Sequence, residues 1–191
     1  MQWAAPLAVA VAALCFASVQ AACPNGFTSI DDVSEGTSTC IRLVQSKSTW
    51  QGAKAMCEMF GASLEQVAAK KHHVPKSKEH LRGLSQEPRT RRSLAKLTGD
   101  FHQAAIEEIR KFPELTDEAF WIGGSDEKSE GSWYWLDDDP IPLGTPHWYP
   151  CNNQPNHGTD QNHLCLYTPD FFYHSLEQQR QIYSICQTDT I

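Results

Sequence analysis

The chain has 191 residues, with 16 Lys and Arg against 23 Asp and Glu, so its formal net charge is −7. An acidic protein of this kind is poorly suited to nucleic acid, which is recognised by positively charged surfaces. The length is enough for one domain with a single hydrophobic core and too short for two comfortable domains.

The N-terminal segment predicts export. Its first 21 residues contain no charged side chain and include an apolar run over 7–16, followed by the small-residue pattern Val19-Gln20-Ala21. We predict a secretory signal peptide over 1–21 and a mature chain over 22–191, with an uncleaved anchor as the alternative. Cleavage would remove Cys15 and leave six cysteines, an even number that suits disulfide pairing in an oxidising compartment.

The mature chain begins with a predicted hairpin and a helix. Two short strands, one after Cys23 and one from Cys40, surround a polar turn, and a disulfide between these cysteines would stabilise the hairpin. The helix is predicted from Ser48, a good N-cap, to Gly61, a common helix stop. Its predicted apolar face consists of Trp50, Ala53, Cys57 and Phe60, so Cys57 should point into the core.

A basic segment follows this helix. Residues 70–96 hold nine Lys and Arg against two Glu, a net charge of +7, so the rest of the chain carries −14. Pro and Gly interrupt the stretch and no period is evident, so we predict an exposed insertion over about 70–99, helical in part near Ser93–Leu97. An anionic partner is the alternative explanation of its charge.

A second helix is predicted after the insertion. It should begin at Phe101, with Asp100 as its cap, and end before Pro113. The apolar side chains that recur at helical spacing, and that should face the core, are Phe101, Ala105, Ile109 and Phe112.

From Phe120 onward the pattern changes to short strands. They are predicted near 120–123, 132–136, 164–168 and 182–187. The stretch 137–163 is rich in Pro, Asn, Gly and Asp, and a loop of this length in a compact domain is usually functional or disordered.

Several short motifs follow one another along the mature chain. In order, they are the Cys23/Cys40 hairpin, Ser48-Thr-Trp50-x-x-Ala53-x-x-x-Cys57-x-x-x-Gly61-Ala62-x-Leu64, Phe120-Trp-Ile-Gly123, Trp135, Trp148, Gln154-Pro-Asn156, Leu164-Cys165 and Ile185-Cys186. Together they resemble the C-type lectin-like domain family. The resemblance implies an α+β fold in which two helices flank two small antiparallel sheets, with a long loop that bears the ligand site. It also implies a disulfide between Cys57 and Cys186.

The resemblance further implies a calcium-dependent sugar site in the long loop, but the residues depart from that pattern. Calcium requires six to eight oxygens, several of them from carboxylates. The family motif is Glu-Pro-Asn or Gln-Pro-Asp around a cis proline, whereas this chain has Gln154-Pro155-Asn156 without a carboxylate. His163, next to Asn162, stands where an acidic residue is expected, and 171–175 replaces the expected Trp-Asn-Asp.

The remaining acidic candidates for a metal site in the loop are Asp160 and Asp170. We therefore expect no resident cofactor and interpret Gln154-Pro155-Asn156 as a determinant of loop geometry, with calcium binding as the alternative.

The last two cysteines have no simple counterpart in the family pattern. Cys165 matches the position of a family cysteine, but its expected partner is replaced by Gln178 or Gln179, and Cys151 is additional. We predict a Cys151–Cys165 disulfide that closes the long loop. The alternative is that both are free for intermolecular bridges.

The segment Arg89-Thr90-Arg91-Arg92-Ser93 resembles the recognition sequence of furin-like proteases of the secretory route. It lies in a polar stretch interrupted by Pro and Gly, where backbone is accessible to proteases. Cleavage after Arg92 is therefore one hypothesis, and an uncut basic loop is the other.

The sequence does not predict an enzyme. His72, His73 and His80 could cluster, but no His-Glu-x-x-His zinc motif is present. There is no Gly-x-Ser-x-Gly motif and no phosphate-binding loop. The predicted bridges use all six mature cysteines and leave no thiolate nucleophile.

We predict a secreted, extracellular recognition protein that binds a glycan or glycoprotein through the surface over 144–175. The aromatic side chains expected to stack on a ligand are Trp148, Tyr149, Phe171, Phe172 and Tyr173, with a core position as the alternative for Trp148. The side chains expected to donate or accept hydrogen bonds are Gln154, Asn156, Asn162 and His163. The alternative function is a calcium-independent protein-binding or structural matrix module, processed at Arg92.

Overall fold

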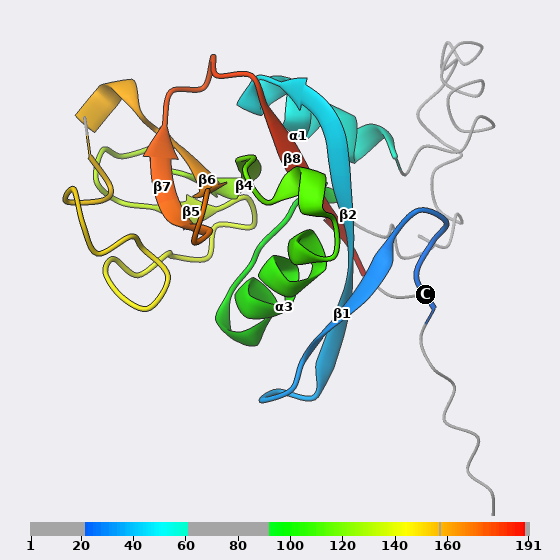
Figure 1. Cartoon of the computed structure of the whole chain (residues 1–191). Helices are drawn as coiled ribbons and strands as arrows, with labels where there is room; N and C mark the ends of the chain where they lie inside the picture. The colour runs from blue at the N-terminus through cyan, green and yellow to red at the C-terminus, as the bar shows by residue number, and fades with distance from the viewer. Residues whose placement is uncertain (1–21, 61–91, 157, 190–191) are drawn as a thin grey trace, which may run out of the picture.

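The computed structural model describes residues 22–60, 92–156 and 158–189 (Figure 1). The predicted signal peptide and the part of the predicted insertion before Arg92 lie outside the described residues.

The described part of the chain contains two α-helices, eight strands and two short 3₁₀ helices. They are β1 (Thr28–Asp32), β2 (Thr37–Ser48), α1 (Trp50–Met59), β3 (Ser93–Leu94), α3 (Gly99–Arg110), η1 (Pro113–Leu115), β4 (Phe120–Ser125), β5 (Tyr134–Trp135), η2 (Gly158–Asp160), β6 (His163–Tyr167), β7 (Phe172–Leu176) and β8 (Ile182–Thr188). The predicted α+β class with two helices is confirmed.

The strands form one continuous sheet rather than two separate ones. Their order is β1-β2-β8-β4-β6-β7, with β3 on β8 and β5 on β4. Every pairing is antiparallel except that of β4 with β8, which matches Phe120 with Tyr183 and Trp121 with Ser184. This short parallel pairing joins the part of the sheet near the N-terminus to the part that carries the long loop.

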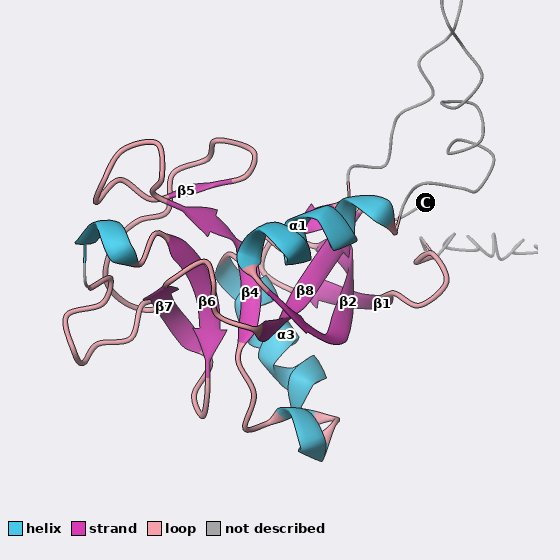
Figure 2. Cartoon of the chain, turned by 90° about the horizontal axis from the view of Figure 1, so that it is seen from above, coloured by secondary structure: helices cyan, strands magenta, loops and turns pink. Residues whose placement is uncertain are grey.

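The two helices cover opposite faces of the sheet (Figure 2). Successive residues of a strand point to opposite faces, and β8 follows this rule. Ile185 belongs to the core cluster that includes Ala105, Ile106 and Ile109 of α3, whereas Cys186 belongs to the cluster that includes Trp50, Ala53 and Cys57 of α1.

Helix α1 begins one residue later than predicted. Its N-cap is Thr49, whose hydroxyl accepts a hydrogen bond from Gly52 N at 3.1 Å, so Ser48 is not the cap. The predicted buried face is confirmed for Trp50, Ala53 and Cys57. The Trp50 indole also donates to Ile122 O at 3.0 Å, which ties the first turn of the helix to β4.

Two predicted disulfides are confirmed. Cys23 bonds to Cys40 across the β1–β2 hairpin, and Cys57 on α1 bonds to Cys186 on β8. The second bridge spans 129 residues and links the first helix to the last strand.

The C-terminal end of the predicted insertion is part of the core. Ser93–Leu94 is a strand, β3, paired with β8, and Leu94, Ala95 and Leu97 are at most 1% exposed. Ala95 N donates to Ile185 O at 2.8 Å, and Ala95 O accepts from Gly123 N at 2.9 Å. The predicted exposed, partly helical stretch is therefore wrong for Ser93–Leu97, because it begins with a strand of the sheet and its apolar side chains pack in the two core clusters.

Helix α3 begins two residues before the predicted start, with Thr98 as its N-cap. Ala105 and Ile109 are buried as predicted, together with His102 and Ile106. Phe112 is 37% exposed because it lies beyond the helical end at Arg110, so its predicted place in the core is wrong. Neither helix in the described residues has the length and apolar content needed to cross a bilayer.

The long bridge should dominate resistance to unfolding. Replacing Cys57 and Cys186 together by Ala should lower the free energy of unfolding by about 5 kcal/mol, because an unfolded loop of this length gains much conformational entropy. Urea denaturation measures the change. The control Cys151→Ser removes an exposed, unpaired thiol and should leave the midpoint unchanged; an equal loss in both variants would contradict the assignment.

Candidate functional site

The candidate site lies where the long loop meets β6 and β7, at the end of the molecule away from β1 (Figure 1). The loop leaves β5 after Trp135, includes the cis peptide Gln154–Pro155, and returns to β6 at His163. This is the surface that the sequence predicted.

Ser175 on β7 is the hydrogen-bonding centre of this region. Its hydroxyl oxygen accepts from Asn156 N at 3.0 Å and lies 3.1 Å from Gln154 Oε1 and from Asn156 O. Gln154 Oε1 also accepts from Ser175 N at 2.9 Å. Gln161 Oε1 is a further 3.3 Å neighbour of the hydroxyl. Two of the four predicted polar residues, Gln154 and Asn156, are therefore brought together, but they bond to the protein itself.

This arrangement does not fit the calcium ion that the fold family uses for sugar. The donor set around Ser175 holds amide, carbonyl and hydroxyl oxygens and no carboxylate, and Gln154 Oε1 already accepts two contacts from Ser175. A calcium site of useful affinity needs charged oxygens. Among the described residues, the oxygens around Ser175 therefore do not by themselves make a calcium site.

The predicted contact residue His163 lies in the core. It is 2% exposed, and its ring centroid lies 4.3 Å from that of Trp50. Burial lowers the pKa of His163, partly opposed by Glu127, whose Oε1 lies 3.3 Å from His163 Nε2. The neighbouring Asn162 is half-buried, and its carbonyl accepts from Asp126 N at 3.2 Å. A direct ligand contact by His163 is therefore contradicted.

Three of the predicted stacking residues are also buried. Trp148, Phe171 and Tyr173 are each 1% exposed, which contradicts a contact role for them and confirms the core alternative for Trp148. The Trp148 indole donates to Pro142 O at 3.0 Å, and the Tyr173 hydroxyl donates to Leu97 O. Their rings pack edge to face, with centroids 5.8 Å apart.

Four accessible aromatic side chains around β7 form a separate surface, which we call the aromatic surface and define as Tyr149, Tyr167, Phe172 and His174. The rings of Tyr149 and His174 are stacked at 4.8 Å, Tyr149 lies 5.9 Å from Phe172, and Tyr167 lies 5.2 Å from His174. Phe172 and His174 flank Tyr173 on β7, so strand alternation turns them to the face opposite to it. Burial lowers the pKa of His174 to about 4, so the surface is uncharged at neutral pH.

A second polar site was not predicted from the sequence. A cavity of about 370 Å³ is lined by Asp126, Glu130, Gly131, Trp133, Asn153, Pro155, Asn156, Gly158 and Gln161. Asp126 is 3% exposed; its Oδ2 accepts from Gly131 N at 2.9 Å, whereas its Oδ1 has no hydrogen-bond partner among the described residues. Burial raises the pKa of Asp126. Two carboxylates beside several amide oxygens are the donor types that hard cations prefer, so these residues fit a calcium ion.

The metal candidates proposed from the sequence lie elsewhere. Asp160 and Asp170 are exposed, and neither lines the cavity with Asp126. Across the described ranges no three His, Cys, Asp or Glu side chains gather closely enough to hold a metal ion by themselves. The spacing Asp126-x-x-x-Glu130, just after a buried strand, is the sequence signal that could have indicated the cavity.

The predicted Cys151–Cys165 bridge is wrong. Cys165 is buried on β6, and Cys151 is exposed in the turn before Gln154; neither is bonded to another described cysteine. Cys165 belongs to the core cluster under α1, its Sγ lies 3.6 Å from His174 O, and burial raises the pKa of its thiol.

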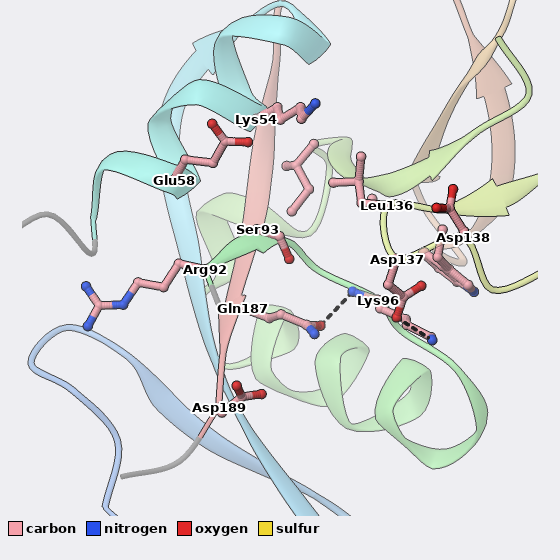
Figure 3. A pocket seen from close by; sticks show the side chains of 13 residues that line it. Lys54, Glu58, Arg92, Ser93, Lys96, Leu136, Asp137, Asp138, Gln187 and Asp189 are labelled. Carbon is pink, nitrogen blue, oxygen red and sulfur yellow. Dashed lines mark hydrogen bonds and ion pairs between the residues drawn. The ribbon is translucent and has the colours of Figure 1, made fainter. Parts of the chain in front are cut away.

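A larger cleft of about 730 Å³ lies between α1, β3, the end of β8 and the turn after β5 (Figure 3). Its charged lining comes from Lys54, Glu58, Arg92, Lys96, Asp137, Asp138 and Asp189. Lys96 pairs with Asp137 at 2.7 Å, and its backbone N donates to Gln187 Oε1 at 2.6 Å. None of the predicted ligand-binding residues lines this cleft, and its charges have both signs.

The predicted cleavage position Arg92 lies at the edge of this cleft. Its guanidinium donates to Phe60 O, and the next residue, Ser93, pairs with Gln187 in the β3–β8 ladder. A protease would have to detach β3 to cut after Arg92, so this placement does not favour cleavage.

Comparison with known proteins identifies similar structures but no relative that matches in sequence. No protein-family model and no curated protein matches the sequence. The C-type lectin CEL-I from Cucumaria echinata is similar in structure, with a TM-score of 0.62 and 16% identity over 88% of this chain and 99% of that one. The cow CD23 carbohydrate-recognition domain, solved with a GlcNAc2Man3 oligosaccharide, has a TM-score of 0.60 and 14% identity over 90% and 99%.

A calcium-independent type II antifreeze protein is also similar, with a TM-score of 0.53 and 21% identity over 89% of this chain and 96% of that one. The chain therefore has the C-type lectin-like fold, which confirms the resemblance seen in the sequence at the level of the fold.

The hydrogen bonds of Ser175 generate a test of the site geometry. Ser175→Ala should lower the free energy of unfolding by about 1–3 kcal/mol, because Asn156 N would lose its acceptor in a partly buried position. Thermal or urea unfolding measures the loss. Thr159→Ala, an exposed position in the same loop, is the matched control and should be neutral; a neutral Ser175→Ala would remove this serine from its central role.

Proposed function

With the C-type lectin-like fold as the premise, we propose that the protein is secreted and recognises an extracellular glycan or glycoprotein without a calcium ion between protein and sugar. The observation that carries the proposal is the Ser175 cluster: Gln154 and Asn156 bond to Ser175, and none of the hydrogen bonds that Ser175 forms involves a carboxylate. A binding role, rather than catalysis, follows from the same surface.

The relatives in fold support both parts of the proposal. The cow CD23 domain was solved with an oligosaccharide, and the antifreeze protein is described as calcium-independent. Secretion is supported by the predicted signal peptide over 1–21 and by two disulfides, which persist mainly in oxidising compartments.

The aromatic surface is the part of the site that we assign to ligand contact. A sugar ring presents an apolar face edged by hydroxyls, and aromatic side chains with polar tips offer stacking area and hydrogen bonds together. The hydroxyls of Tyr149 and Tyr167 and the ring nitrogen of His174 provide such tips, and Tyr167 is 37% exposed.

In this proposal, the role of a bound calcium ion is structural and is separate from ligand recognition. Asp126 and Glu130 would hold it in the cavity that Asn153, Asn156 and Gln161 also line. The ion would supply positive charge between two carboxylates and thereby hold the long loop against the turn after β4.

A glycan array probed in calcium and in chelator tests the recognition mode. We expect the same glycans to bind in both conditions. Phe172→Ala and Tyr149→Ala should each weaken binding by about tenfold, because each removes stacking area. Leu136→Ala, exposed on the turn beside the larger cleft, is the control and should bind normally. Binding lost in chelator would contradict the proposal, and an array without any bound glycan would favour the protein-binding alternative.

Thermal melting of the protein in calcium and in chelator tests the proposed structural calcium ion separately from glycan binding. At calcium tenfold above its dissociation constant, the protein should gain about 1.4 kcal/mol, which corresponds to a rise in Tm of about 3 °C. Asp126→Asn should abolish this rise, whereas the exposed control Asp170→Asn should keep it. The absence of any calcium-dependent shift in the unmodified protein would rule out the structural ion.

A further inference from the structure

Two histidines from distant parts of the chain meet between α3 and the long loop. The Nδ1 atoms of His102 on α3 and His147 in the loop lie 2.9 Å apart. His102 is 6% exposed, and His147 is half-buried. Neither residue belongs to the Ser175 cluster or to the aromatic surface.

The hydrogen positions of this pair follow from its third partner. His102 Nε2 lies 2.8 Å from Phe171 O, and a carbonyl oxygen can only accept, so Nε2 must carry the hydrogen. A neutral His102 then has a bare Nδ1, which accepts from His147 Nδ1–H. The neutral pair therefore has one fully bonded arrangement, with His147 Nε2 left without a hydrogen.

The surroundings offer little compensation for added charge. The titratable group packed against both rings is Tyr173, whose ring centroid lies 4.8 Å from that of His102 and 5.2 Å from that of His147. The Tyr173 hydroxyl is directed to Leu97 O. Within the described ranges, no carboxylate or amine forms a hydrogen bond or ion pair with either imidazole.

The backbone next to this pair fastens the loop to β7. Tyr173 N donates to His147 O at 2.8 Å, and Tyr149 N donates to Tyr173 O at 3.2 Å. The two histidines thus stand where α3, β7 and the loop are held together. Release of His147 would also free Tyr149, a member of the aromatic surface.

We propose that His102 and His147 form a proton-operated latch that holds the long loop on α3 at neutral pH and releases it in acid. A first proton on His147 Nε2 leaves the Nδ1–H to Nδ1 bond intact. A second proton, on His102 Nδ1, sets two N–H donors and two positive charges face to face at hydrogen-bonding distance. The half-buried ring of His147 then moves into solvent, and the loop backbone at His147 moves with it.

The pH range follows from the two rings. Burial lowers the pKa of both, and for His102, where the nearby His147 adds to the effect, the pKa falls to about 4. In the unfolded chain both would titrate near their ordinary value of about 6.5. The unfolded or released state binds more protons, so the latch stabilises the loop fully above about pH 6.5 and loses its effect as the pH falls toward 4.

Amide hydrogen exchange on the whole protein tests the latch. Protection factors, which correct for the intrinsic pH dependence of exchange, should fall at least about tenfold for the Tyr149 and Tyr173 amides between pH 7 and about pH 4.5. Amides of the β2–β8 ladder should keep their protection. In His102→Gln the fall should disappear, because the Gln amide can donate to Phe171 O and never acquires a proton in this range.

Two further variants make the outcome decisive. His147→Gln retains a donor for His102 Nδ1 and should suppress the fall in amide protection, as His102→Gln does. If His102→Gln loosens the loop already at pH 7, the result for His147→Gln decides between the outcomes. His163→Gln removes another buried histidine and should leave the fall unchanged. Unchanged protection in acid, an equal fall throughout the sheet, or a fall that persists in both latch variants would overturn the proposal.

Discussion

Two residue pairs between β4 and β8, together with Ala95, which is hydrogen-bonded to both strands, join the halves of this sheet and support the end of the molecule that carries the long loop. On one side lie β1, β2 and β8, fixed by the Cys57–Cys186 disulfide to α1; on the other lie β6 and β7, which carry the candidate site. The pairing is short, so it is supported from both faces by side chains. Trp121 packs in the α1 cluster and Phe120 in the α3 cluster. The scaffold is therefore well packed where the site is attached, and the loop is held both by buried side chains such as Trp148 and by polar contacts.

Those polar contacts explain why the motif Gln154-Pro155-Asn156 persists without the charge of an ion site. A carboxylate at Gln154 or Ser175 would need a cation to offset its burial, whereas an amide and a hydroxyl satisfy one another. The loop thereby gains its shape from neutral hydrogen bonds. Two acidic residues of this end of the molecule, Asp126 and Glu130, line the smaller cavity together with Pro155 and Asn156.

The fold was largely predictable because its determinants are local or covalent. Helical spacing placed Trp50 and Cys57 on one face, the hairpin pattern predicted the Cys23–Cys40 bridge, and the family resemblance implied the Cys57–Cys186 bridge. The details of the site were less accessible to sequence reasoning. His163 is polar yet buried, because it packs on Trp50 from a segment 113 residues away in the chain. Asp126 meets Asn156 only through tertiary structure.

Two predictions made from the composition of the sequence are wrong. Leu94, Ala95 and Leu97 are apolar residues within a strongly basic stretch, so the average of the segment concealed a core strand. Cys151 and Cys165 were paired by counting, but the pleat of β6 decides which way Cys165 points. In both cases the direction of a side chain, which only the assembled sheet determines, outweighed the properties of the residues themselves.

The alternation of β7 has a consequence for how such a protein can change. Tyr173 and Ser175 maintain the interior and the loop, whereas Phe172 and His174 face outward. Substitutions at the two outward positions leave the inward hydrogen bonds in place. The residues of this strand that the fold needs are therefore different from those that would contact a ligand. New specificities could evolve, or be engineered, by varying alternate residues of a single five-residue strand.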